Sequence, residues 1–175
     1  MVNHDSYPDA YIRAILGATK TIAMVGASAN EARPSFFVLK YLAARGYSIL
    51  PINPGLAGGT IAGIAVYGAL ADVPCPIDMV DIFRNSAAAG AVVDTALTLS
   101  PRPPVIWMQL GVRNDAAAAR AEAVGVKVVM NRCPKIEFGR LSGEIGWSGV
   151  NSRVLSARKP LRAGAGFQRF TIGRE

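Results

Sequence analysis

The stretch GASANEARPS, which follows the first long apolar run of the chain, holds side chains suited to binding an anion. Gly26 permits a tight turn and a close approach of the backbone, and Ser28 offers a hydroxyl. Arg33 precedes Pro34, a favoured first residue of a helix, and its guanidinium has the paired donors that match phosphate oxygens. Ser35 adds a hydroxyl in the first turn, where free amides and the helix dipole favour negative charge. The loop therefore predicts a phosphate site.

A purely structural interpretation of this loop is also open. Serine and asparagine side chains stabilise turns, so Ser28 or Asn30 can shape the loop while Arg33 is a solvated charge. Ser35 can equally serve only to start the helix. We favour phosphate binding for the loop as a whole, because a buried strand precedes it and a helix opening with Arg-Pro-Ser follows it.

The end of the next apolar run discriminates between nucleotide ligands. NAD-binding domains usually place Asp or Glu there to accept from the ribose hydroxyls, whereas this run ends PINPG, with Asn53 and no acid. The first loop also departs from G-x-G-x-x-G, and no G-x-x-x-x-G-K-[ST] sequence occurs, which excludes an ordinary ATP-hydrolysing P-loop. An NAD(P)-dependent oxidoreductase with an atypical glycine-rich loop is the alternative function.

Two further candidates end later apolar runs. Arg84 directly follows IDMVDIF, and Gln109 follows PVIWM. Ligands of doubly wound folds lie at the carboxyl ends of strands, so both side chains are expected on the ligand side. Arg84 would contact phosphate rather than remain a surface charge. Gln109 would bond amide groups of a ligand or stabilise a turn, and Trp107, inside its run, belongs to the core.

The histidine and the two cysteines offer little catalytic chemistry. His4 lies near a terminus expected to fray, which removes a histidine triad, a zinc site or a phosphohistidine unless it folds back. Cys75 stands between two prolines without an adjacent base. Cys133 lies beside Arg132 before a predicted helix, where the thiol pKa could be lowered, but we favour a buried structural cysteine. We expect no metal site and no catalytic residue.

Apolar runs and helical periods alternate along the chain. The pattern predicts strands at 21–26, 47–53, 77–83, 104–111 and 126–131, a short strand at 64–67, and helices after Pro8 and at 34–46, 86–100 and 114–125. Continuous apolar strands are typical of parallel sheets covered on both faces. Strands alternating with helices predict a doubly wound, mainly parallel α/β sheet in a single domain.

Composition favours a compact globular protein, with 51% hydrophobic and 18% charged residues. No apolar run is long enough to cross a bilayer and the start lacks the pattern of a signal peptide, so we expect a cytoplasmic protein without a membrane partner. Residues 151–175 hold six basic residues and one acidic residue, which is +5 of the total charge of +7. The basic stretch VNSRVLSARKPLR lacks interleaved aromatic residues, so it is expected to be solvated rather than to bind nucleic acid. Packing across a second copy in a homo-oligomer is a third alternative.

Five motifs taken together resemble a known family. The succession VGAS…RPS, PINP, DMVDIFR, VIWMQLGV and VVMNRCPKIE is similar to stand-alone CoA-binding domain proteins, relatives of the N-terminal domain of the succinyl-CoA synthetase alpha subunit. The late IGWSGVNS is typical of a subset of them. The resemblance divides the chain into an N-terminal helix at 1–19, a Rossmann-like CoA-binding domain at 20–140 and a basic extension at 141–175.

The resemblance also implies roles for individual residues. The contacts it implies are, for the pyrophosphate, Gly26, Ala27, Ser28, Arg33, Pro34 and Ser35; for the adenosine, Asn53 and Pro54; and for the flanks of the ligand path, Phe83, Arg84 and Gln109. Relatives often carry a lysine just after Asn-Pro, whereas this chain has Gly55 and Leu56. Arg84 or Lys40 could then supply the contact to the adenosine 3′-phosphate.

The resulting hypothesis is a binding module for coenzyme A or an acyl-CoA. The synthetases of the related family need an active-site histidine that carries phosphate, together with further domains, and neither is recognisable in this sequence. We therefore expect a protein that catalyses no reaction by itself.

Overall fold

A computed structural model describes residues 2–143 of the chain. Five strands form one sheet: β1 (Thr21–Val25), β2 (Ser48–Ile52), β5 (Met79–Ile82), β6 (Val105–Met108) and β7 (Lys127–Val129). All neighbours are parallel and the order is β2-β1-β5-β6-β7. The prediction of a doubly wound, Rossmann-like parallel sheet in one domain is confirmed.

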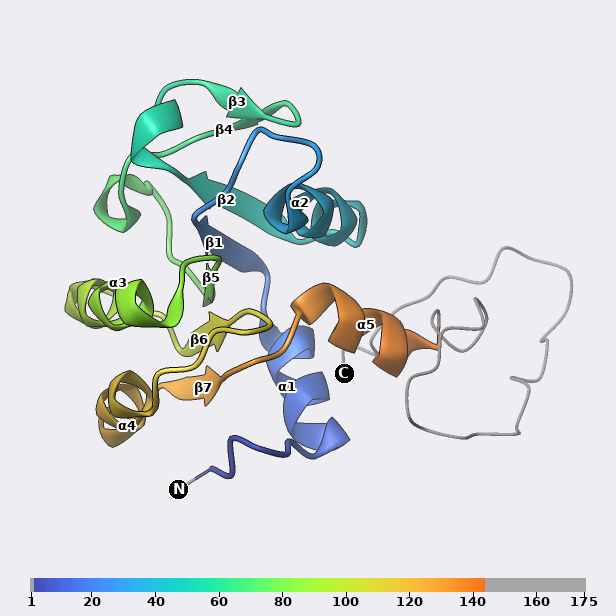
Figure 1. Cartoon of the computed structure of the whole chain (residues 1–175), viewed down its shortest axis with the longest axis vertical. Helices are drawn as coiled ribbons and strands as arrows, with labels where there is room; N and C mark the ends of the chain where they lie inside the picture. The colour runs from blue at the N-terminus through green and yellow to red at the C-terminus, as the bar shows by residue number, and fades with distance from the viewer. Residues whose placement is uncertain (1, 144–175) are drawn as a thin grey trace, which may run out of the picture.

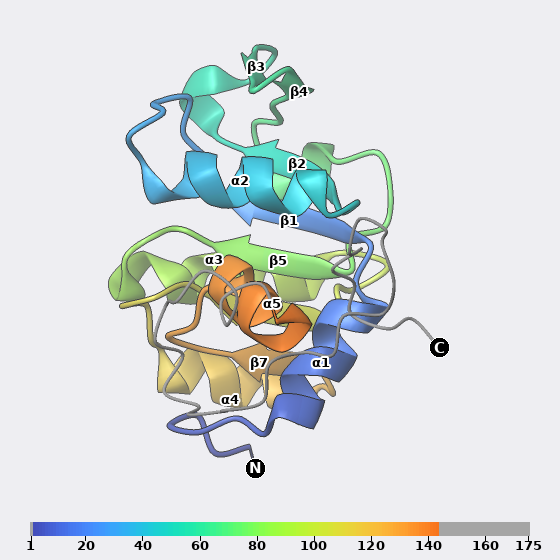
Figure 2. The same ribbon diagram turned by 90° about the vertical axis from the view of Figure 1, so that its right-hand side faces the viewer.

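Five α-helices among residues 2–143 cover the two faces of the sheet. They are α1 (Asp9–Ala18), α2 (Pro34–Ala44), α3 (Ser86–Thr98), α4 (Asp115–Ala123) and α5 (Pro134–Ser142). Figures 1 and 2 show α1, α2 and α5 on one face, with α3 and α4 on the other. Alternate residues of each strand feed two cores, as in β1, where Met24 packs on the α2 and α5 side and Ala23 on the α3 side.

Local sequence accounts for most of the element ends. Pro34 opens α2 at its first position, and Gly46 leaves the helix with a φ of +87°. The Asn114 side chain accepts from the Ala117 amide at 3.0 Å and so caps α4. These signals explain why the predicted element bounds differ from the observed ones by only a few residues.

The connection from β2 to β5 contains no α-helix. It is built from the single turns η1 (Pro54–Leu56) and η2 (Leu70–Asp72) and from a hairpin of β3 (Thr60–Ile61) and β4 (Ile64–Ala65). After β4 the chain returns to the edge of β2, where Tyr67 pairs with Ile52. The strand predicted at 64–67 is thus shorter than expected, and it pairs outside the main sheet.

The N-terminal segment is packed rather than frayed, which corrects the expectation for His4. Its Nδ1 lies 2.8 Å from the Tyr7 hydroxyl, and its Nε2 lies 3.3 Å from a carboxylate oxygen of Glu122 in α4. The Tyr7 hydroxyl in turn accepts from the Met130 amide at 2.8 Å, just beyond edge strand β7. Within residues 2–143, no helix has the length and apolar character required to cross a membrane.

Candidate functional site

The sheet reverses its strand order between β1 and β5, and the loops leaving these two strands meet there. Gly26 follows β1 with a φ of +89°, and a Cβ at this position would lie only 2.7 Å from the carbonyl oxygen of Phe83, just after β5. The Phe83 amide donates to the Val25 carbonyl at 2.8 Å, which holds the two exits together. We call the surface between the Gly26–Ser35 loop and Phe83–Arg84 the notch. Only glycine fits at position 26, as the sequence predicts.

The loop of the notch is shaped by its own side chains. Ser28 Oγ accepts from the Asn30 amide at 3.1 Å, and Asn30 Oδ1 accepts from the Ala32 amide at 2.9 Å. The structural interpretation of these two residues is therefore correct. It does not exclude ligand binding, because the Ser28 hydroxyl keeps its own hydrogen to donate. The side chain of Ala27, which lies between Gly26 and Ser28, is buried in the core.

Helix α2 begins at the notch. Its N-cap is Arg33, whose side chain is exposed and has no recorded partner among the described residues. Pro34 occupies the first position, and the first turn contains no acidic residue. Ser35 is only 4% exposed, so its hydroxyl lies below the surface. The helix start is thus electropositive, with Arg33 as its accessible side chain.

Asn53 holds the end of β2 against the loop. Its Nδ2 donates to the Ala27 carbonyl at 2.8 Å, and its Oδ1 accepts from the Gly55 amide at 2.9 Å. Both polar atoms of the Asn53 side-chain amide therefore form hydrogen bonds within the protein. No carboxylate stands at the end of β2, where an NAD ribose would need one.

A pocket of about 370 Å³ opens beside the notch, on the α3 face of β1 and β2. Its walls include Gly26, Asn53 and Pro54 on one side and the small side chains of Ala88 and Ala91 in α3 on the other. Arg84 is the single ionisable side chain among its described lining residues. Arg84 is exposed, and no partner of its side chain is recorded among residues 2–143. The predicted residues at the ends of β1, β2 and β5 are thus brought together.

Gln109 lies on the opposite face of the sheet from this pocket, at the end of β6. It is 6% exposed, and its Nε2 donates to both carboxylate oxygens of Asp81, at 2.9 and 3.0 Å. Asp81 is completely buried in β5, and burial raises the pKa of its carboxyl to about 8 although the Gln109 hydrogen bond lowers it. The sequence did not predict this pair.

Cys133 is the N-cap of α5 and is 6% exposed. Burial raises the pKa of its thiol, and this outweighs the lowering by the helix amides of Lys135 and Ile136. The neighbouring Arg132 guanidinium lies 5.6 Å from the centre of the Tyr7 ring. The favoured interpretation, a buried structural cysteine, is therefore supported, and the alternative of a lowered thiol pKa is wrong.

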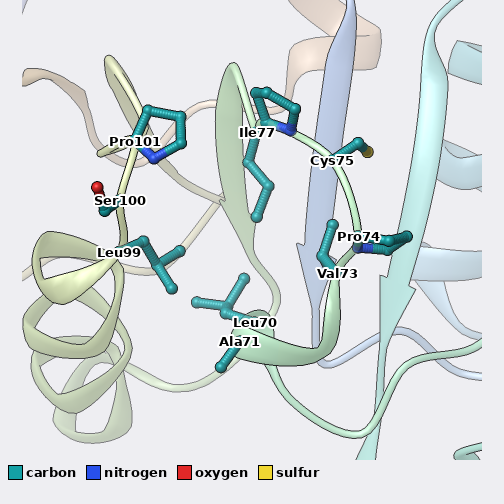
Figure 3. Close-up of a pocket in the computed structure, with 10 residues that line it drawn as sticks. Leu70, Ala71, Val73, Pro74, Cys75, Ile77, Leu99, Ser100 and Pro101 are labelled. Atoms are coloured by element: carbon teal, nitrogen blue, oxygen red, sulfur yellow. The ribbon is translucent and has the colours of Figure 1, made fainter.

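A second pocket, of about 240 Å³, lies at the opposite edge, where β5 and β6 begin (Figure 3). Leu70, Ile77 and Leu99 supply much of its wall, and the exposed Cys75 stands at its rim. It contains none of the predicted site residues. No group of three or more potential metal ligands occurs in the part of the chain that the structure describes.

Comparison with known proteins shows the family of the chain. The sequence profile of the CoA binding domain matches residues 20–139. The chain belongs to the CoA-binding domain family. This agrees with the resemblance seen in its motifs and with a loop suited to phosphate.

Relatives of this CoA-binding domain share both sequence and fold. The uncharacterized protein YneT of Bacillus subtilis is 34% identical over 127 residues, which cover 73% of this chain and 91% of YneT. Prb, the PH1109 protein redesigned for binding, is 36% identical with a TM-score of 0.74, over 79% of this chain and 94% of Prb. A hypothetical protein from Pyrococcus horikoshii OT3 is 33% identical with a TM-score of 0.73, over 81% and 96% of the two chains.

Proposed function

We propose that this CoA-binding domain binds coenzyme A or an acyl-CoA with the pyrophosphate in the notch. The observation that carries the proposal is the pocket of about 370 Å³ at the exits of β1, β2 and β5, which Gly26, Asn53 and Arg84 line together. Arg33 borders the notch on the side of α2 and Arg84 on the side of β5. Two guanidiniums without recorded partners among residues 2–143 are suited to the two charges of a pyrophosphate.

The pocket beside the notch suits the adenosine end of the ligand. Its volume of about 370 Å³ falls in the range of small-molecule pockets, and its wall of alanine and proline side chains can receive an aromatic base. Arg84 is within this wall and can reach a phosphate on the ribose, whereas Lys40 lies over the Phe36 ring, 5.5 Å from its centre, and is not part of the wall. Of the two substitutes for the absent lysine, Arg84 is the better placed.

We further propose that the domain catalyses no reaction by itself. The ionisable side chains at the notch and its pocket are Arg33, Arg84 and the exposed Glu31 of the loop, and the two guanidiniums only donate hydrogen bonds. Asp81, whose pKa of about 8 would suit a general acid, is completely buried. Both the side chains at the site and the family of the chain therefore support a binding role.

Isothermal titration calorimetry with CoA, acetyl-CoA and NADH tests this function. We expect saturable binding of CoA and acetyl-CoA at one site per chain and no comparable heat with NADH. Adenosine 3′,5′-bisphosphate, which lacks the pantetheine arm, should compete with CoA for this site. Tight binding of NADH, or no response to millimolar CoA, would contradict the proposal.

A further inference from the structure

Asn131 lies two residues beyond the edge strand β7, and its backbone adopts a conformation that few residues other than glycine tolerate. Its φ is +52°, in the left-handed region, and the residue is exposed. Asparagine occupies this region more easily than most residues, because its short amide side chain can form hydrogen bonds with the nearby backbone. Unusual backbone conformations are concentrated at functional sites, and the contacts proposed at the notch do not use Asn131.

Two hydrogen bonds fix Asn131 against the loop that leaves β6. Its backbone amide donates to the Val112 carbonyl at 3.1 Å, and its Oδ1 accepts from the Gly111 amide at 2.8 Å. Only the oxygen of a side-chain amide accepts hydrogen bonds, so this contact settles which end of the amide faces the loop. The donor Nδ2 is the remaining end, and it has no recorded partner among residues 2–143.

The surroundings of this donor are apolar rather than charged. Leu110 directly precedes Gly111 and is 55% exposed. The two nearest cations in the chain, Arg113 and Arg132, are both tied to the N-terminal segment through Asp5. An uncharged donor next to an exposed leucine suits a carbonyl group that carries a small apolar substituent, because the donor satisfies the oxygen while the leucine covers the substituent.

The exits of β6 and β7 lie within reach of a ligand held as proposed. The adenosine would occupy the pocket on the β2 side of the notch, so the pantetheine arm would leave the pyrophosphate on the other side, towards β6 and β7. These strands lie one and two places beyond β5, roughly 5 and 10 Å at the usual strand spacing. The arm has about twelve bonds from its phosphate oxygen to its sulfur, which equals four residues of extended chain or about 13 Å.

We propose that Asn131 is a specificity-determining residue, whose Nδ2 donates to the thioester carbonyl of an acyl-CoA and so favours the acylated ligand over free coenzyme A. The inference rests on the proposed function, because it needs the pyrophosphate in the notch. The thioester carbonyl lies at the far end of the arm, where free coenzyme A has only a thiol, a weak acceptor. Leu110 packs against the aliphatic part of the acyl group.

The test compares acetyl-CoA with S-ethyl-CoA, a thioether that differs from it only in lacking the carbonyl oxygen. Calorimetry of the wild-type protein should give a Kd about fivefold lower for acetyl-CoA, the effect expected for one hydrogen bond. Asn131→Asp keeps the acceptor for the Gly111 amide and loses the donor, so the preference should disappear. Asn3→Asp adds the same charge at a residue whose Oδ1 also accepts a backbone amide, that of Asp5 at 2.9 Å, and this control should keep the preference.

Each outcome decides the inference. If neither ligand binds and coenzyme A does not bind either, the proposed function fails and the inference with it. If the ligands bind but the wild-type protein does not prefer acetyl-CoA, or Asn131→Asp retains the preference, or Asn3→Asp loses it, only the inference is overturned. Should Asn131→Asp fold poorly, the side-chain amide resonances of Asn131 in the wild-type protein replace it. They must shift more with acetyl-CoA than with S-ethyl-CoA, and equal shifts would overturn the inference.

Discussion

The Cα of Gly26 and the carbonyl oxygen of Phe83 approach so closely that a Cβ on residue 26 would lie 2.7 Å from that oxygen. This contact joins the exits of β1 and β5 at the point where the strand order reverses. Because the obstructing atom belongs to the backbone directly after the central strand β5, it cannot move aside as a flexible side chain would.

Gly26→Ala should therefore destabilise the fold and impair CoA binding. A left-handed φ and an overpacked contact together are expected to cost about 2–4 kcal/mol. Gly46→Ala is the matched control, because its φ of +87° is similar but nothing lies within 4 Å of the added Cβ. Urea unfolding and CoA titration should show a smaller loss of stability and normal affinity in the control. Equal losses in both variants would contradict the close contact.

Arg33→Ala and Arg84→Ala should each weaken CoA binding by roughly 10–100-fold, the effect of removing a charge-assisted hydrogen bond. Both variants should also bind CoA with less dependence on salt. Arg102→Ala is a suitable control, since Arg102 is exposed and its Nε donates to the Leu97 carbonyl at 3.0 Å, away from the notch. Calorimetry at two ionic strengths measures both effects. Unchanged CoA affinity in both the Arg33 and the Arg84 variant would show that the two guanidiniums do not contribute to the binding site.

The buried Asp81 should make stability fall as the pH rises. The unfolded chain releases this proton near its ordinary pKa of 3.8, whereas the folded protein keeps it up to about 8. Between these values folding takes up a proton, so the free energy of unfolding should decrease by up to about 1.4 kcal/mol per pH unit through this group. Urea unfolding from pH 5 to 8 should show a steeper fall for the wild-type protein than for Asp81→Asn. Parallel profiles would contradict the assignment.

The two cysteines should differ in reactivity. Cys75 is exposed, while burial raises the pKa of Cys133 and shields its sulfur. At pH 8, a thiol reagent should label Cys75 rapidly and Cys133 only when the protein unfolds. Mass spectrometry of labelled peptides checks this, with Cys75→Ser expected to abolish rapid labelling. Rapid modification of Cys133, or its disulfide with CoA, would instead favour a reactive thiol.

The sequence alone predicted the sheet and the place of the notch, because both follow from local signals. Continuous apolar runs marked the parallel strands, and Gly26 and Pro34 marked the turn between β1 and α2. The residues that end parallel strands must meet at one edge of the sheet, so Asn53 and Arg84 could be placed beside the loop before the structure was known.

Contacts between distant residues were not accessible in this way. Asp81 and Gln109 meet because β5 and β6 have a particular register, which no local pattern specifies. His4 reaches Glu122 although 118 positions separate them, so the expectation of a frayed terminus was wrong. The hydrogen bonds of the Asn53 side chain with the backbone of Ala27 and Gly55 likewise depend on the path of the loop. The prediction for the basic tail at 151–175 lies outside the described residues.

A crystal structure of the protein grown with CoA tests the central claim most directly. We predict that the pyrophosphate lies against the backbone of Gly26–Ser35, with Arg33 and Arg84 within hydrogen-bonding distance and the adenine in the pocket beside α3. A bound CoA located elsewhere, with the notch occupied only by solvent or by the protein's own side chains, would contradict it.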